Sequence, residues 1–203
     1  MRGGRALGVV ALLGLLAACG GGATGSSGTT ELSGTPLDPP AQVVATPLVD
    51  TAGDPYSLVD DTDKDLTLVF FGYTNCPDIC GQVMATLAGT LARLDDSEKE
   101  RLDVVFVTTD PARDDAAVVD DYVSAFDPSI VGLTGDLDDI VEVGKSLYVG
   151  VDQGEKLPSG GYDVTHGTRV MAIDADDQTP IMWDHDVSQA QLAHDVLMLL
   201  DKG

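Results

Sequence analysis

The chain has 203 residues, 43% of them hydrophobic, which suits one packed domain preceded by a leader. Its 34 acidic residues against 11 basic ones give a formal net charge of -23 at pH 7. This charge excludes nucleic-acid binding, because a phosphate backbone would be repelled, and it argues against docking on anionic lipid through a basic patch.

The N-terminus has the plan of an export signal. Arg2 and Arg5 precede an apolar run from Ala6 to Leu16, which is too short to span a membrane. Small residues and then Cys19 follow, in a pattern that resembles the cleavage box of bacterial lipoproteins. This resemblance implies that residues 1–18 are removed, that lipid is attached to the Cys19 thiol, and that the protein lies on the extracytoplasmic face of the cell membrane. The alternative is an ordinary signal peptide with a chance cysteine.

The rest of the chain divides into a linker and a domain. Residues 19–40 are rich in Gly, Ser, Thr and Pro, which is typical of a flexible tether. Residues 41–203 are predicted to form the folded domain. Two short strands are expected at its start, over Gln42–Leu48 and Tyr56–Val59.

The centre of the domain is predicted to be two buried strands with a helix between them. The strands are the apolar, β-rich runs Leu68–Phe71 and Leu102–Thr108. Between them, helical spacing predicts a core-facing stripe that consists of Val83, Met84, Leu87, Leu91 and Leu94. We assign Met84 to this stripe rather than to a metal site.

The second half of the domain is predicted to alternate helices and strands and to end on a helix. In chain order we expect a helix at Asp114–Phe126, an extended piece at Ile130–Leu133, a helix at Leu137–Leu147, an exposed loop at Asp152–Asp163, a hairpin of Thr168–Ile173 and Pro180–Trp183, and a final helix capped by Ser188.

Two cysteines lie where the first core strand meets its helix. Cys76 and Cys80 are four residues apart, and Pro77 suits the opening turn of a helix. Residues four apart share one helix face, so the two sulfurs are expected to converge on one ion or to close on each other. A helix start favours thiolate, and two thiolates select Cu(I) or Zn(II) over Mg²⁺ or Ca²⁺. A strand, a cysteine pair and a helix, followed by further strands and helices, predict an α/β fold, a thioredoxin-like sandwich with a central mixed sheet flanked by helices.

The segment around the two cysteines carries a specific family resemblance. The segment Phe71–Cys80 resembles the signature of the Sco/SenC family, which consists of copper-delivering proteins of cytochrome oxidase assembly. Three later segments resemble the family in the same order, namely Asp110–Asp114, Gly132–Gly135 and Tyr162–His166. The resemblance covers about Val43 to Leu200, nearly the whole predicted domain.

The resemblance implies that Cys76, Cys80 and His166 bind copper, as Cu(I) or Cu(II), and that the lipid-anchored protein delivers it to the dinuclear copper centre of cytochrome c oxidase subunit II. The implied partners are that subunit, the membrane, and a copper donor protein or thiol reductant. The resemblance favours a metallochaperone without catalytic turnover over an enzyme. The segment Asp110–Asp114 is expected to order the loop beside the site by capping and ion pairing.

This sequence departs from the family pattern at three positions near the proposed ligands. Asn75 replaces a histidine before the first cysteine, Gly81 replaces a proline after the second, and Thr165 replaces an acidic residue before the histidine. No proposed ligand is lost. The departures leave open how the surrounding residues orient the thiols and the imidazole.

Other functions remain open for the same residues. The main alternative is a thiol–disulfide oxidoreductase that reduces the copper-receiving cysteines or other exported disulfides, although three residues between the thiols, rather than two, disfavour fast general exchange. A structural disulfide, a peroxidase and a structural zinc site rank lower. His185 and His194 are expected to be ordinary solvated or turn residues.

Overall fold

The computed structural model of the protein describes residues 31–156 and 162–201, and it describes no side chain from 152 to 166. The predicted signal sequence, its cleavage site and the lipidation of Cys19 therefore lie outside the described residues. One compact unit spans Glu31–Gly203. Within the described residues, no helix combines the length and the apolar character that crossing a membrane requires.

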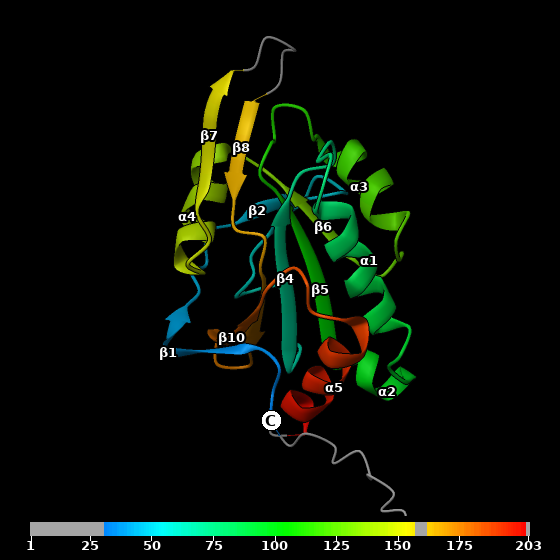
Figure 1. The fold of residues 1–203 in the computed structure, drawn as a ribbon. Helices are drawn as coiled ribbons and strands as arrows, with labels where there is room; N and C mark the ends of the chain where they lie inside the picture. The colour runs from blue at the N-terminus through cyan, green and yellow to red at the C-terminus, as the bar shows by residue number, and fades with distance from the viewer. Residues whose placement is uncertain (1–30, 157–161, 202–203) are drawn as a thin grey trace, which may run out of the picture. The chain divides into compact units, whose positions relative to one another are not determined.

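A mixed eight-stranded sheet forms the centre of this unit, in the order β1-β10-β9-β4-β5-β6-β2-β3 (Figure 1). Strand β4 runs parallel to β5 and antiparallel to β9, and β5 runs parallel to β6. The strands are β1 Thr35–Gln42, β2 Leu48–Asp50, β3 Pro55–Tyr56, β4 Leu66–Gly72, β5 Leu102–Thr108, β6 Val131–Thr134, β9 Val170–Asp174 and β10 Gln178–Trp183. A separate hairpin consists of β7 Val151–Lys156 and β8 Tyr162–His166.

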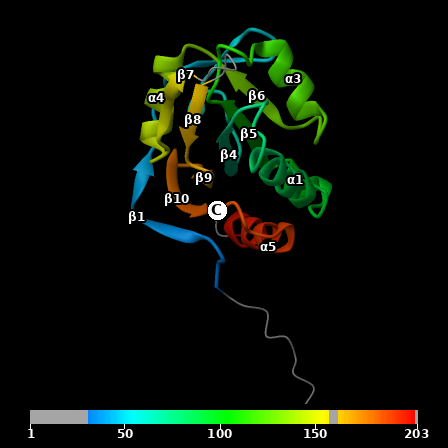
Figure 2. The same cartoon turned by 45° about the horizontal axis from the view of Figure 1, so that its top comes forward.

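Helices cover both faces of the sheet (Figure 2). On one face lie α1 Cys80–Leu91, α3 Ala116–Ser124 and α5 Gln189–Leu200. On the other face lies α4 Leu137–Ser146. A short helix, α2 Asp96–Lys99, begins with a capping box at Asp95 and precedes β5. The sandwich with a mixed sheet and flanking helices, which the sequence predicts, is confirmed.

Strand β4 is buried on both faces because its side chains alternate between two cores. Leu68 and Phe70 pack with α1 and α5, while Val69 and Phe71 pack with α4. All four are fully buried, and burying an apolar side chain of this size stabilises a fold by about 1.5–3 kcal/mol. A strand held from both sides gives the loop at its carboxyl end a fixed starting point.

The structure corrects two expectations near the start of the domain. Strand β1, Thr35–Gln42, begins inside the segment predicted as tether, residues 19–40, and pairs antiparallel with β10. Residues 43–47 are not in a strand, so the strand expected at Gln42–Leu48 is wrong. Proline and threonine in β1 masked its strand character, and this edge position tolerates proline because only one side of the strand is paired.

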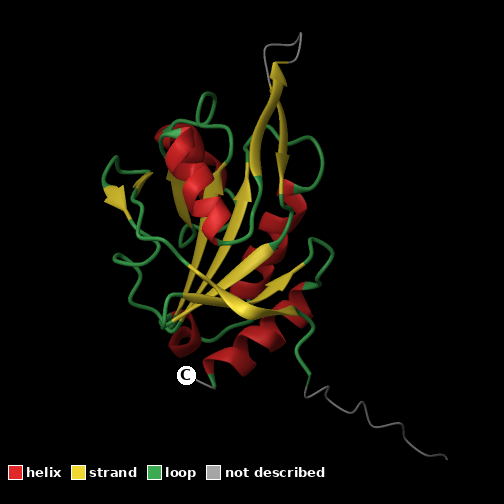
Figure 3. Cartoon of the chain, turned by 90° about the vertical axis from the view of Figure 1, so that its left-hand side faces the viewer, coloured by secondary structure: helices red, strands yellow, loops and turns green. Residues whose placement is uncertain are grey.

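The predicted loop at Asp152–Asp163 is also corrected. Its backbone forms most of the β7–β8 hairpin, whose pairing joins Val151 to His166. Figure 3 shows this hairpin projecting beyond the end of the main sheet. Polar residues and glycines suggested a loop, but a hairpin that lies off the core needs no apolar alternation to form its backbone ladder.

The other predicted elements are confirmed with shifted ends. Strands β4 and β5, helices α1, α3 and α4, and the hairpin β9–β10 fall where the sequence places them. Ser188 caps α5 through a capping box with Gln191. The short strand expected at Tyr56–Val59 is present only as Pro55–Tyr56.

The segment just before β1 is held against α5 by one buried carboxylate. Asp195 Oδ2 accepts hydrogen bonds from Ser33 N at 2.8 Å, Ser33 Oγ at 2.6 Å, Gly34 N at 3.1 Å and Trp183 Nε1 at 2.8 Å. A Cβ on Gly34 would lie 2.6 Å from Trp183 Nε1, so only glycine fits this approach. The domain therefore includes residues that the sequence predicted as tether.

Candidate metal centre

The loop that carries the cysteines starts from the buried end of β4. A Cβ on Gly72, the last residue of β4, would lie 2.9 Å from Phe70 Cε1 and 3.2 Å from Cys80 Sγ. Glycine is therefore required for close packing of the Cys80 sulfur against the end of the strand. This contact brings the start of α1 directly onto the carboxyl end of β4.

The two cysteines lie on different elements. Cys80 is the first residue of α1 and is fully buried, while Cys76 lies in the loop before it and is half-buried. The helix thus begins at Cys80, three residues later than Pro77 suggests. The thiols still meet, because the side chains of Cys76 and Cys80 are hydrogen-bonded to each other, and both are free rather than joined in a disulfide.

The surroundings of Cys76 and Cys80 give the two thiols different pKa values. Burial acts to raise the pKa of Cys76, but hydrogen bonds from the Cys80 side chain and from the backbone of Asp78, Ile79 and Cys80 outweigh it and lower this pKa. Burial and the hydrogen bond to Cys76 raise the pKa of Cys80 to about 12. Cys76 is therefore the thiol that ionises first, at the start of a helix, where negative charge is favoured.

Tyr73 lies between the dithiol and the loop that follows β5. Its carbonyl accepts a hydrogen bond from Cys76 N at 3.2 Å, and its hydroxyl is hydrogen-bonded to the Cys76 side chain. Burial and the neighbouring Cys76 raise the pKa of Tyr73 to about 12. The guanidinium of Arg113 lies 6.0 Å from the centre of its ring. The hydroxyl remains protonated and is a donor towards sulfur.

Asp110 anchors the loop after β5 from inside the protein. It is buried and forms an ion pair with Arg113, and its carbonyl accepts hydrogen bonds from Arg113 N and Asp114 N at 3.0 Å each. Burial raises the pKa of Asp110 in spite of the arginine. The expected ion-pair role of this segment is thus present.

The structure brings the backbone of His166 to the cysteine end of the sheet. His166 ends β8 and precedes β9, whose first residue, Val170, pairs with Phe70 near the end of β4. The His166 side chain lies outside the described side chains. Among the side chains that are described, no third histidine, cysteine or acidic residue joins the two thiols to make a cluster of three.

The other residues considered for metal binding have ordinary positions. Met84 is fully buried in the core on the α1 side of the sheet, as its place in the helical stripe predicts. His194 is exposed on α5, and His185 is half-buried in the turn before that helix.

Comparisons with known proteins decide the family. The family described as SCO1/SenC matches residues 43–201. The chain belongs to the SCO1/SenC family.

Among curated relatives, the mitochondrial protein SCO2 of Saccharomyces cerevisiae is 33% identical over 137 residues, which is 62% of this chain and 45% of that protein. The mitochondrial SCO1 homologue of Homo sapiens is 32% identical over 124 residues, 56% of this chain and 41% of that protein. The chain spans less than half the length of both relatives.

Solved structures of family members share the fold. The apo Sco1 protein of Thermus thermophilus superposes with a TM-score of 0.74 at 27% identity, covering 85% of this chain and 98% of that one. Yeast Sco1 with copper bound superposes with a TM-score of 0.72 at 27% identity, covering 81% of this chain and 91% of that one. Arabidopsis thaliana ScoI with copper bound gives a TM-score of 0.70 at 26% identity, covering 80% and 100%. The resemblance drawn from the sequence motifs is confirmed.

Proposed function

We propose that this protein binds copper through Cys76 and Cys80 and delivers it during assembly of cytochrome c oxidase. The observation that carries the proposal is the pair of free thiols in mutual contact at a loop, within a chain that matches a family whose solved members include copper-bound forms. The recipient in this proposal is the dinuclear copper centre of oxidase subunit II.

The donor set fits copper in its reduced state. Thiolates are soft ligands, which favour Cu(I) over oxygen-preferring ions. Cys76 has a lowered pKa, so it supplies a thiolate readily, while the Cys80 proton is displaced when an ion coordinates its sulfur. His166 is the proposed third ligand, since its backbone lies at the same end of the sheet. Three ligands at a loop leave room for a ligand of the recipient.

The proposed cellular setting rests on the sequence. The apolar leader and the lipoprotein-like cleavage box support removal of residues 1–18, a lipid on Cys19 and a location on the extracytoplasmic face of the cell membrane. A copper donor protein or a thiol reductant would supply the metal and keep the thiols reduced. Delivery itself needs no catalytic turnover.

A titration of the purified, reduced protein with Cu(I) against a chromophoric chelator tests the proposal. We expect one equivalent to bind tightly, with Cys76→Ser and Cys80→Ser each abolishing this binding and His166→Ala weakening it. The control His194→Ala changes an exposed histidine on α5 and should bind as the wild type does. Unchanged binding in both cysteine variants would rule out the proposed site.

The difference in pKa between the thiols of Cys76 and Cys80 favours a second candidate function, that of a thiol–disulfide oxidoreductase. A partly exposed thiol of low pKa beside a buried thiol of high pKa is the arrangement of an attacking and a resolving cysteine. Reduction of insulin by the copper-free protein, retained in His166→Ala, would support this function. Weakened copper binding in His166→Ala without any such activity would support the metallochaperone.

A further inference from the structure

Asp114 makes contacts that its position beside a helix does not require. It is fully buried, yet α3 is capped by its neighbour, because Asp115 accepts the hydrogen bond from Val118 N at 3.0 Å. The Asp114 carboxylate instead bonds to two other segments. The capping role expected for this carboxylate from the sequence is therefore performed by another residue.

The Asp114 carboxylate joins the loop after β4 to the end of β5. Its Oδ2 accepts hydrogen bonds from Thr74 N at 2.9 Å and from Thr108 Oγ1 at 2.7 Å. Its Oδ1 accepts from Thr74 Oγ1 at 2.7 Å. Both carboxylate oxygens are thus used, and Thr74 is bonded through both its backbone and its side chain. Hydrogen bonds to a buried charged group are among the strongest in proteins.

A second set of bonds holds the same loop at its root. Thr109 N and Thr109 Oγ1 donate to the carbonyl of Gly72 at 2.6 and 3.1 Å. Thr74 itself lies two residues before Cys76 and next to Tyr73, whose carbonyl accepts from Cys76 N. The position of Thr74 consequently sets the position of the Cys76 backbone.

We propose that Asp114 is a positioning residue that holds the loop in the form in which Cys76 and Cys80 are a contacting dithiol, and that it thereby shifts the balance between dithiol and disulfide towards the dithiol. The inference rests on the proposed function only in taking the reduced pair as the working state. The sequence motif alone does not assign this role.

The chemistry gives the direction of the effect. Oxidation by the disulfide of dithiothreitol removes two electrons and two protons from the thiols of Cys76 and Cys80, forms the bond between their sulfurs, and yields reduced dithiothreitol. The sulfurs must then approach to about 2.05 Å. Cys80 is buried at the start of α1, so the Cys76 loop is the part that moves. Bonds that hold this loop oppose the movement, and their loss favours the disulfide.

The test is equilibration of the full-length protein in dithiothreitol redox buffers, with alkylation and mass spectrometry of the peptide that carries both cysteines. We expect Asp114→Asn and Thr74→Val each to shift the equilibrium about tenfold towards disulfide, which lowers the potential by about 30 mV. Thr74→Ser retains both donors and should rescue the wild-type value within about twofold.

Asp195→Asn is the matched control. It exchanges another fully buried, multiply bonded carboxylate, but one that holds Ser33 and Trp183. We expect Asp195→Asn to leave the equilibrium between dithiol and disulfide unchanged. Values within twofold of wild type for Asp114→Asn and Thr74→Val, or an equal shift in Asp195→Asn, would overturn the proposal. If Asp114→Asn fails to fold, the comparison of Thr74→Val with Thr74→Ser decides whether the proposal holds.

A parallel Cu(I) titration separates this inference from the proposed function. A wild-type protein that binds no copper, with variants that shift the thiol equilibrium, refutes the copper site and supports the positioning role. Normal copper binding with no shift in any variant refutes the positioning role and leaves the copper site standing.

Discussion

The thiols of Cys76 and Cys80 differ in acidity because the backbone places them in different surroundings. Cys76 receives hydrogen bonds from the backbone of Asp78, Ile79 and Cys80, at and just before the start of α1. Cys80 packs against Gly72 at the end of β4. Because only the thiolate is nucleophilic, the pair should react in a fixed order. The same order matters for metal capture, since the more exposed sulfur meets an incoming ion first.

Alkylation of the reduced protein tests this order. With iodoacetamide at about pH 7, Cys76 should be modified much faster than Cys80, because the pKa of Cys76 is lowered while that of Cys80 is raised to about 12. The rate at Cys76 should rise with pH to a midpoint below that of an ordinary cysteine. Peptide mass spectrometry gives the two rates, and equal labelling of both thiols would contradict the prediction.

Helix α1 gives a test of its own, because it begins at a proposed ligand, Cys80, and continues with core residues. Met84 is fully buried one turn after Cys80 and packs into the α1 side of the core. We expect Met84→Leu to change the free energy of unfolding by less than about 1.5 kcal/mol, as volume-conserving core exchanges do. Copper stoichiometry should stay the same. Loss of bound copper in this variant would show that the thioether is a ligand.

Asp195 connects the first residues of the domain to the last helix. Replacing it with alanine leaves the donors of Ser33, Gly34 and Trp183 without their acceptor, so we expect urea unfolding to show a loss of about 3 kcal/mol. Asp184→Ala is the control, because Asp184 forms only an exposed ion pair with Arg169 and should cost less than about 1 kcal/mol. Equal losses in the two variants would contradict the role given to Asp195.

The elements divide clearly into those that the sequence predicts and those that it does not. Strands β4 and β5 are mainly apolar and almost entirely buried, so composition alone reveals them. Strand β1 contains three prolines and pairs on one side only, and the β7–β8 hairpin lies off the main sheet. Neither of these segments needs the apolar pattern by which strands are recognised.

The candidate site, like the fold, is predicted only in part by the sequence. The pairing of Cys76 with Cys80 follows from their spacing, but the start of the helix at Cys80 follows from tertiary contacts. The bond between Thr74 and Asp114 spans 40 residues, and it could not be inferred from local pattern. A signal was nonetheless present, because two adjacent acids, Asp114 and Asp115, precede α3 and one helix start needs only one cap.

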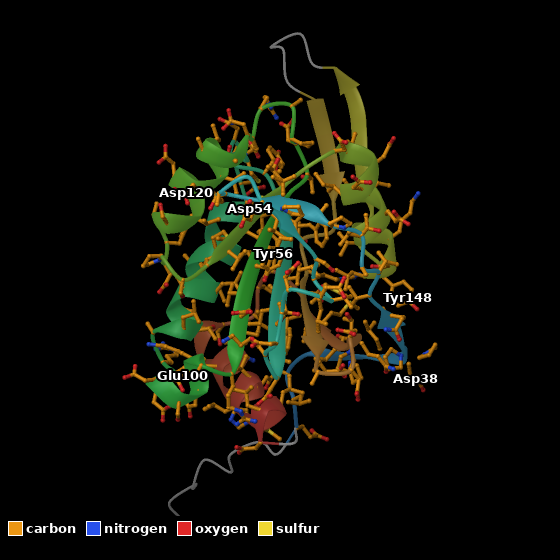
Figure 4. All side chains as sticks on the ribbon, turned by 180° about the vertical axis from the view of Figure 1, so that it is seen from behind. Asp38, Asp54, Tyr56, Glu100, Asp120 and Tyr148 are labelled. Carbon is orange, nitrogen blue, oxygen red and sulfur yellow. The ribbon has the colours of Figure 1, made fainter. Side chains whose placement is uncertain are left out.

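At the scale of the whole molecule, negative charge is spread over many elements. Figure 4 labels Asp38 on β1, Asp54 in the turn after β2, Glu100 at the end of α2 and Asp120 on α3, and all four are exposed. With 34 acidic and 11 basic residues in the chain, these charges repel one another at neutral pH. Raising NaCl from about 0.01 M to about 1 M shortens the Debye length from about 30 Å to about 3 Å and should raise the melting temperature.

The buried Asp110 and the half-buried Asp103 give the sign of the pH dependence. Burial raises the pKa of Asp103 and of Asp110 in the folded state above the value in the unfolded chain. The folded protein therefore binds these protons more tightly, and their contribution to stability is lost as the pH rises through the folded pKa. Denaturant unfolding should show these contributions being lost as the pH rises above the usual aspartate pKa of about 3.9, and Asp103→Asn should reduce this loss. A stability that rises steadily with pH over this range would contradict the account.

The most direct test of the copper site is X-ray absorption on the protein loaded with one equivalent of Cu(I). We predict two sulfur scatterers and one nitrogen scatterer in the wild type and loss of the nitrogen in His166→Ala. In Cys76→Ser and Cys80→Ser, whose tight binding is abolished, any copper that remains should show fewer than two sulfurs. Two sulfurs that persist in both cysteine variants would place the copper elsewhere and contradict the account.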